Sequence, residues 1–303
     1  MAVSPWSDPE PIECQDSAEL LIKLDPSSPL WAPFQHGQWA FRGQADASWD
    51  LVPRALRSHE LLSFSDPALH ARLDRNAQIQ AEWTLLAEFT ELADELGFHL
   101  PGDLSTFRFP WKAHEQPVRA LNQPWPPTDI LEVAAIAQHH GVPTRLLDFT
   151  FNPLVAAYFA AANPGPPSGY LAVWAVDVEF IQTAWAPFCS GVRIVQVARG
   201  SNPFLHAQSG LFVYDAADDT ASIRERVLTH DIHSVTHIDP AMKDHLARSP
   251  RVRCITLPTS QCSPLLEQLA ARRVTRAHLQ PTLDNVAAQL WAASRRAGLS
   301  GGA

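Results

Sequence analysis

Apolar residues recur every three or four positions in several segments, which is typical of amphipathic helices. The longest such segment runs from about residue 71 to a stop at Gly97. Its predicted apolar face consists of Ile79, Trp83, Leu86, Phe89 and Leu92. Shorter helical patterns cover residues 18–24, 128–140, 153–162, 262–273 and 281–297. The helix at 153 has the clearest start, because Asn152 suits the N-cap and Pro153 the first helical position.

Short runs of β-branched and aromatic residues lie between these helices and predict strands. They fall at residues 38–42, 170–176, 192–197, 211–214 and 251–257. This mixture of short strands and helices indicates an α+β fold. We expect a single domain over 17–297, after a loose leader at 1–16 and before a flexible tail at 298–303. The Pro-rich stretch 100–128 is predicted to be an irregular loop insertion.

Composition narrows the class of protein. The 303 residues include 23 Lys and Arg and 32 Asp and Glu, which gives a net charge of −9. The chain as a whole therefore lacks the positive charge typical of nucleic-acid-binding proteins, although a local basic patch is still compatible with this sum. No stretch approaches the ~18–20 apolar residues of a membrane helix, and the acidic N-terminus lacks the features of a signal peptide. The four cysteines form no C-x-x-C pair. We therefore expect a cytoplasmic protein without a metal or a membrane partner.

Three polar segments are candidates for chemistry, and the first is Trp39–Gln44. Arg42 ends a short predicted strand, and its guanidinium fork suits a phosphate or a carboxylate. Gly43 would let a ligand approach the backbone. A structural ion pair of Arg42 is the alternative interpretation.

The second segment, 138–153, reads QHHGVPTRLLDFTFNP and is predicted to be a loop between two helices. Its adjacent histidines, His139 and His140, would point about 100° apart on a helix, and no third ligand has a metal-site spacing. Asp148 has helix capping or pairing with an arginine as its alternative roles. For Thr150 the alternative is an ordinary turn hydroxyl.

The third segment, AQSGLF at 207–212, places Gln208 just before a Ser-Gly pair and a strand, so its amide can face a pocket. An ordinary loop before a strand is the alternative. The chain contains no G-x-S-x-G, P-loop or G-x-G-x-x-G pattern, so hydrolase, P-loop NTPase and Rossmann interpretations have no local support.

Together, these segments resemble the FRG domain family, whose name describes Phe41-Arg42-Gly43. FRGQADASWDLVPRALR resembles the family's opening motif, QHHGVPTRLLDFTFNPLVAAYFA its central motif and AQSGLF its third. The tail ITLPTSQCSPLLEQLAARRVTRAHLQPTLDNVAAQL also fits the family. The resemblance covers about residues 17–290.

A second resemblance, to mono-ADP-ribosyltransferases, rests on the order of Arg42, Asp148-Phe149-Thr150 with its small-residue helix, and Gln208. It implies a small, split antiparallel sheet flanked by helices, with NAD as the substrate. Arg42 would then grip the phosphates or ribose of NAD, and Gln208 would stand at the position of the catalytic carboxylate. Thr150, with a nearby aromatic ring such as Phe149 or Tyr158, would hold the nicotinamide. The other residues expected to bind NAD are Gly43, Gln44 and Asn152.

A neutral amide at Gln208 supplies no charge to the positive ribose that forms when the glycosidic bond breaks. Either another acid does this work, with Asp148 as the first candidate and Glu132 as the second, or the site binds a nucleotide without cleaving it. His139 is a candidate general base, or a hydrogen-bonding group of the loop.

The sequence leaves three hypotheses open. The leading one is an ADP-ribosyltransferase-like enzyme that uses NAD to modify an unknown macromolecular or small-molecule acceptor, as a bacterial toxin or phage-defence effector. The second is a non-catalytic module that binds a nucleotide or a nucleic-acid end, and the third is a scaffold in which the polar residues form a buried network.

Overall fold

A computed structural model defines the fold of most of the chain. It describes residues 10–31, 38–57, 75–100, 124–163, 165–166, 168–185, 191–197, 207–217, 222–229, 239–241, 244 and 251–296. Nearly all of the expected loop insertion at 100–128 and the expected tail at 298–303 lie outside these residues.

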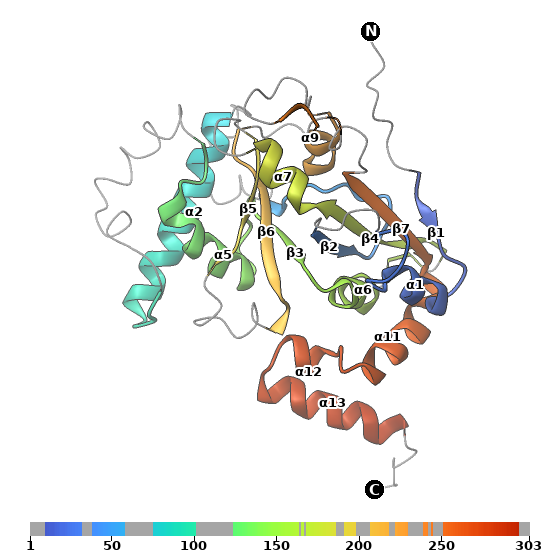
Figure 1. Cartoon of the computed structure of the whole chain (residues 1–303). Helices are drawn as coiled ribbons and strands as arrows, with labels where there is room; N and C mark the ends of the chain where they lie inside the picture. The colour runs from blue at the N-terminus through green and yellow to red at the C-terminus, as the bar shows by residue number, and fades with distance from the viewer. Residues whose placement is uncertain are drawn as a thin grey trace, which may run out of the picture.

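A seven-stranded mixed sheet forms the centre of the described part of the protein (Figure 1). The strand order is β1-β7-β4-β2-β3-β6-β5. The strands are β1 (Ile12–Glu13), β2 (Trp39–Gln44), β3 (Leu147–Thr150), β4 (Tyr170–Asp177), β5 (Val192–Val195), β6 (Gly210–Asp215) and β7 (Val252–Pro258). Neighbouring strands are antiparallel except β1 and β7, which are parallel. The sheet is therefore larger than expected, and mixed rather than wholly antiparallel.

The sheet is split between β2 and β3. β2 pairs with β4 along its whole length, and β3 pairs with β6 along its whole length. The two strands pair with each other only at Phe41 and Thr150. Beyond that pair, the backbones of β2 and β3 share no further register, which leaves room for side chains between them.

The described residues contain nine α-helices. They are α1 (Ser17–Leu24), α2 (Arg75–Glu95), α5 (Leu131–His139), α6 (Pro153–Ala162), α7 (Val178–Trp185), α9 (Ile223–Thr229), α11 (Cys262–Ala271), α12 (Arg276–Leu279) and α13 (Leu283–Arg296). One face of β2, β4 and β7 shares a hydrophobic cluster with α1, α6 and α11, and β6 shares another with α2 and α5. The opposite face packs on α7 and α9. Strand β3 thus lies between α5 and α6, as Figure 1 shows.

Most elements expected from periodicity are confirmed, and the differences arise from pairing between distant segments. The segment expected to be a loop, 138–153, contains β3, because Leu147–Thr150 finds partners in β6. The expected loose leader ends in the sheet, since Ile12 and Glu13 pair with β7 and Cys14 is buried. Helices α7, α9 and α12 are additional. No helix of the described segments is long and apolar enough to cross a membrane.

Candidate functional site

A pocket of about 500 Å³ lies where β2 and β3 separate, between the end of α5 and the side of α6. This volume falls within the range of small-molecule sites. Its lining residues are Phe41, Arg42, Gly43, Gln44, Ala45, Trp49, Arg57, Gln138, His139, Asp148, Phe149, Thr150, Val155, Ala156, Phe159, Asn163, Gln208 and Gln280. The pocket contains all five residues expected to take part in catalysis, and they come from four separate segments of the chain: Arg42, His139, Asp148, Thr150 and Gln208.

Arg42 places a largely buried positive charge in this pocket. Its Nη1 donates to the backbone carbonyl of Asp148 at 2.8 Å, and the same atom lies 3.8 Å from Asp148 Oδ2. The side chain is 16% exposed, and its buried Nε has no hydrogen-bond partner among the described residues. Burial lowers the pKa of Arg42, Asp148 opposes this change and the charge of Arg57 adds to it. The ion pair is too long to saturate the guanidinium, so Arg42 keeps donors for an anion.

Asp148 supplies an oriented carboxylate beside Arg42. Its side chain is 63% exposed, and Oδ2 accepts a hydrogen bond of 2.7 Å from Gln138 Nε2. The Thr144 hydroxyl donates in turn to Gln138 Oε1. Asp148 alternates along β3 with Leu147 and Phe149, which face the core on the α7 and α9 side, so its own side chain projects toward α5 and α6. It pairs weakly with Arg42 and caps no helix.

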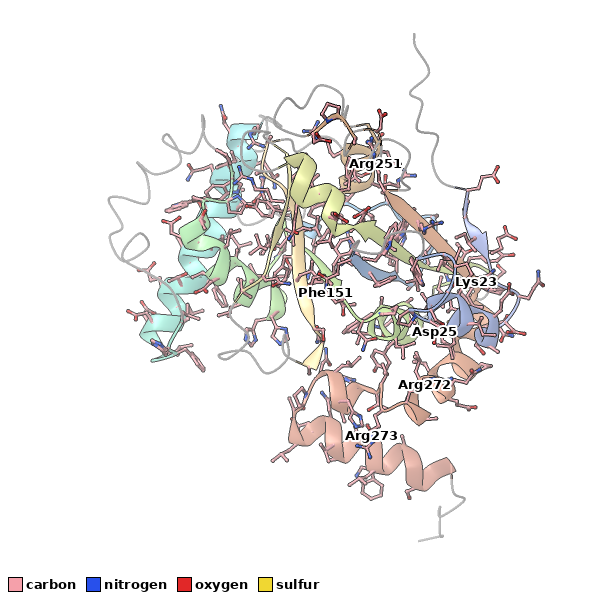
Figure 2. All side chains as sticks on the ribbon, viewed as in Figure 1. Lys23, Asp25, Phe151, Arg251, Arg272 and Arg273 are labelled. Carbon is pink, nitrogen blue, oxygen red and sulfur yellow. The ribbon has the colours of Figure 1, made fainter. Side chains whose placement is uncertain are left out.

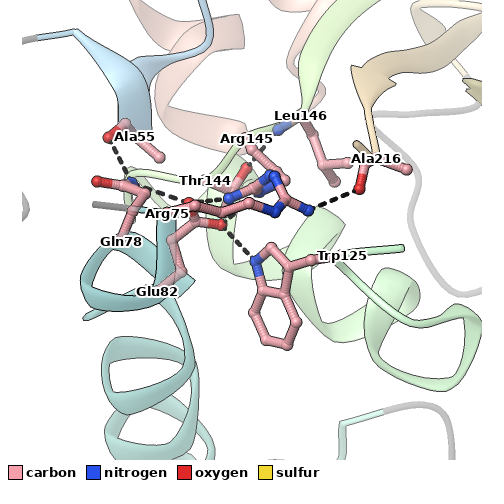
Figure 3. A network of polar contacts seen from close by, with 9 residues as sticks. All are labelled: Ala55, Arg75, Gln78, Glu82, Trp125, Thr144, Arg145, Leu146 and Ala216. Atoms are coloured by element: carbon pink, nitrogen blue, oxygen red, sulfur yellow. Dashed lines mark hydrogen bonds and ion pairs between the residues drawn. The ribbon is translucent and has the colours of Figure 1, made fainter. Parts of the chain in front are cut away.

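A buried polar network holds the segment that carries Thr144 (Figure 3). Arg145 donates to both carboxylate oxygens of Glu82 on α2, from Nε and Nη2, at 2.7 Å each. Trp125 Nε1 donates to Glu82 Oε2 at 2.8 Å, and Gln78 Nε2 donates to Oε1 at 2.8 Å. The backbone carbonyl of Thr144 accepts a hydrogen bond of 3.1 Å from the Ala55 amide. The ion pair of Arg145 with Glu82 therefore holds the chain three residues before Asp148.

His139 is the last residue of α5 and lines the pocket. Burial lowers the pKa of His139, the neighbouring His140 lowers it further, and Asp148 raises it. The two imidazole rings meet edge to face, with centroids 5.3 Å apart. A neutral imidazole at this place can accept a proton. Within the described residues, no group of three or more His, Cys, Asp or Glu is arranged to hold a metal ion.

Thr150 and Gln208 fix each other at the far end of β3. The Thr150 hydroxyl donates to the Gln208 carbonyl at 2.6 Å and accepts from the Asn152 amide at 3.0 Å. The next residue, Ser209, has φ of 49°, and its carbonyl accepts from the amide of Phe151, which Figure 2 labels. A left-handed non-glycine residue is strained, and such strain persists where the surroundings hold it. The Thr150 hydroxyl therefore has a positioning role, in line with its alternative interpretation as a turn hydroxyl.

The Gln208 side chain is anchored to the C-terminal part of the domain. Its Nε2 donates to the backbone carbonyl of Leu279 in α12 at 3.0 Å. The adjacent Gln280 also lines the pocket. Two neutral amides thus border the site, and both can bond to hydroxyl or carboxamide groups.

The motif residues Gly43 and Gln44 serve the packing of the sheet. A Cβ at Gly43 would lie 1.9 Å from the Ala156 carbonyl oxygen and 2.7 Å from the Ala160 amide nitrogen of α6. The helix occupies the space left by the missing side chain, while Gly43 also lines the pocket, so its contact with a ligand stays a prediction. Gln44 is buried, donates to the Asp50 carbonyl and accepts from Trp174 Nε1 at 2.7 Å.

Three other candidate residues do not line the pocket, whereas Phe149 does. Asn152 caps α6 through a bond from the Leu154 amide and lines a separate hollow beside α1. Tyr158 packs against the core, and Phe159, about 100° further round α6, lines the pocket in its place. Phe149 touches the pocket but is 3% exposed and belongs to the core. Glu132, in the first turn of α5, does not line the pocket.

Sequence reasoning missed several residues of the pocket. Trp49 and Arg57 belong to the opening motif, where they had no assigned role, and both line this pocket. Gln138 belongs to the central motif, where its amide had no assigned role. Gln280 carried no local signal, because only the docking of α12 against Gln208 brings it to the site.

Residues 37–168 match the family model of the FRG domain, which supports an FRG domain in this part of the chain. The match spans β2 to α6 and includes Arg42, His139, Asp148 and Thr150, whereas Gln208 and Gln280 lie beyond it. No curated protein and no solved structure matches the chain. The assignment therefore rests on the FRG match, and the resemblance to ADP-ribosyltransferases remains an expectation.

Proposed function

We propose that this protein is an ADP-ribosyltransferase-like enzyme that binds NAD in the pocket between β2 and β3 and breaks its nicotinamide–ribose bond. One observation carries the proposal: a largely buried guanidinium with unused donors lies 3.8 Å from an exposed carboxylate in one pocket. A diphosphate needs the first group, and a ribose that becomes positive in the transition state needs the second.

The residues of the pocket divide the chemistry between them. The C–N bond breaks, and its electron pair leaves with the nicotinamide nitrogen, which becomes neutral. The ribose carbon becomes positive beside Asp148, which supplies the charge that Gln208 lacks. An acceptor hydroxyl or a water molecule then bonds to this carbon and gives its proton to neutral His139. Gln208 and Gln280 hydrogen-bond the ribose hydroxyls or the carboxamide.

The test is nicotinamide release from NAD by the purified full chain. Arg42→Ala is expected to raise KM, because the phosphates lose their guanidinium partner. Asp148→Asn is expected to lower kcat by about a hundredfold, since it keeps the shape and removes the charge. Arg272→Ala and Glu91→Gln are matched controls, because both residues are exposed and neither lines the pocket.

Thermal melting of each variant separates a lost site from a lost fold. Variants that melt within a few degrees of the wild type and lose release support the proposal. Unchanged release in Arg42→Ala contradicts it.

The neutral amide of Gln208 favours one alternative, a module that binds a nucleotide or a nucleic-acid end without cleaving it. In that case NAD or a nucleotide raises the melting temperature, and no nicotinamide appears. Binding of a nucleic-acid end is distinguished by an affinity that falls steeply with added salt.

The proposed biological role is that of a toxin or phage-defence effector, the setting that the resemblance implies. Induced expression in a bacterial host is then expected to lower cellular NAD or to modify a cellular acceptor, and to stop growth. Asp148→Asn at the same expression level should allow growth. Equal toxicity of the two proteins contradicts this role.

A further inference from the structure

Trp49 stands at the junction of the pocket and a second hollow. Its side chain is half exposed, which is unusual for an indole. The second hollow measures about 440 Å³ and is lined by Trp49, Asp50, Val52 and Arg57. Trp49 and Arg57 line both spaces, so the second hollow adjoins the pocket.

The turn that carries Trp49 is held in place before any ligand arrives. The Asp46 carboxylate accepts bonds from the amide and hydroxyl of Ser48, and the Trp49 amide donates to the Asp46 carbonyl at 3.2 Å. On the other side, Asp50 receives two bonds from Arg224, at 2.9 and 3.0 Å. A ligand that stacks on the indole therefore orders little additional chain, which favours affinity.

Two arginines bring positive charge to the pocket, and one of them, Arg57, also lines the second hollow. Arg42 Nη1 lies 3.8 Å from the Asp148 carboxylate, and the Arg57 charge is close enough to lower the pKa of Arg42. Arg57 Nε donates to the Val52 carbonyl at 2.7 Å, which holds this arginine in the second hollow. The pocket thus holds Arg42 and Asp148, while Arg57 and Trp49 line both the pocket and the second hollow.

We infer that the second hollow binds the adenine end of a diphosphate-linked dinucleotide, with Trp49 stacking on the base and Arg57 joining Arg42 on the diphosphate. This inference rests on the proposed function. It assigns to Trp49 the recognition of the adenine base of the substrate. In a dinucleotide such as NAD the diphosphate lies between the bond to be broken and the second base, so a base in the second hollow would leave the diphosphate beside Arg57, which lines both spaces. Every base has an aromatic face, and an exposed indole is a favourable stacking platform.

The experiment is isothermal titration of the full chain with ADP, nicotinamide mononucleotide and NAD. Trp49→Ala is expected to weaken the binding of ADP and NAD by at least about fivefold. The same substitution should change the binding of nicotinamide mononucleotide by less than about twofold. Trp49→Phe keeps a ring and should retain most of the affinity. Trp291→Ala is the matched control, because Trp291 is 68% exposed and lines neither space.

The three ligands separate failure of the inference from failure of the proposed function. The inference is overturned if the wild type does not bind ADP, if Trp49→Ala binds ADP as well as the wild type, or if the mononucleotide loses as much affinity as ADP. If ADP binding depends on Trp49 while NAD is not cleaved, the adenine subsite stands and the proposed enzyme activity falls. If NAD is cleaved and ADP binding does not depend on Trp49, the proposed activity is supported and the adenine subsite is contradicted.

Discussion

Replacement of Gly43 by alanine tests whether the strand–helix contact behind the pocket is as tight as the structure shows. The added Cβ would lie 1.9 Å from the Ala156 carbonyl oxygen and 2.7 Å from the Ala160 nitrogen, whereas ordinary contact begins at 3.4 Å. Both neighbours are backbone atoms, so no rotamer change relieves the overlap. Strand β2 and helix α6 would have to separate by more than about 1 Å, and overpacking of this kind costs typically 1–3 kcal/mol. We expect the upper end, about 3 kcal/mol.

Urea unfolding followed by circular dichroism measures this cost. With a slope of about 3 kcal/mol per molar urea for a chain of this size, the midpoint should fall by about 1 M. Nicotinamide release should fall as well, because α6 carries Phe159 and the other residues that form one wall of the pocket.

Gly169→Ala is the control for this experiment. A Cβ at Gly169 would meet the Pro166 carbonyl oxygen at 3.3 Å, only slightly closer than ordinary contact, and this glycine has no positive φ. Its free energy of unfolding should change by less than about 1 kcal/mol. The reasoning is refuted if Gly43→Ala lowers the midpoint no more than Gly169→Ala does.

Three further predictions follow from buried or titrating groups. Glu82→Gln leaves the Arg145 guanidinium buried without its counter-charge, so thermal melting should show a loss of about 3–5 kcal/mol; a change below 1 kcal/mol contradicts the network. Because burial lowers the pKa of His139, nicotinamide release should stay high at pH 7 and fall with acidification only below the ordinary histidine value of about 6.5; a midpoint above that value contradicts the assignment. Burial raises the pKa of Cys14 to about 11, so mass spectrometry should find it unalkylated by iodoacetamide at pH 8 until denaturant is added; rapid labelling of the native protein contradicts this.

Local signals were sufficient where an element is defined by its own residues. The apolar period predicted α2 over residues 71–97, and the structure places it at Arg75–Glu95. Asn152 and Pro153 predicted the start of α6, and Asn152 accepts the capping bond from Leu154. Both predictions succeeded because helix periodicity and capping depend on residues a few positions apart.

Local signals failed where a distant partner decides the structure. β3 has only four residues and lies in a segment rich in turn-forming and charged side chains, so its strand character comes from β6, more than 60 positions later. Gly43 has no positive φ, and its role depends entirely on the approach of α6. Tyr158 and Phe159 are equivalent by sequence, and only the docking of α6 on β2 decides which ring faces the pocket.

The sequence by itself determined the α+β class, most helices and strands, and the polar residues that can carry chemistry, because periodicity and residue chemistry are local properties. The tertiary structure alone decided which of these groups meet. The register of β2 with β4 and of β3 with β6 opens the sheet at one place, so Arg42 and Asp148, 106 positions apart, come within 3.8 Å. It also decided that the Thr150 hydroxyl holds a turn while Arg42 keeps unused donors, since hydrogen-bond partners depend on neighbours in space.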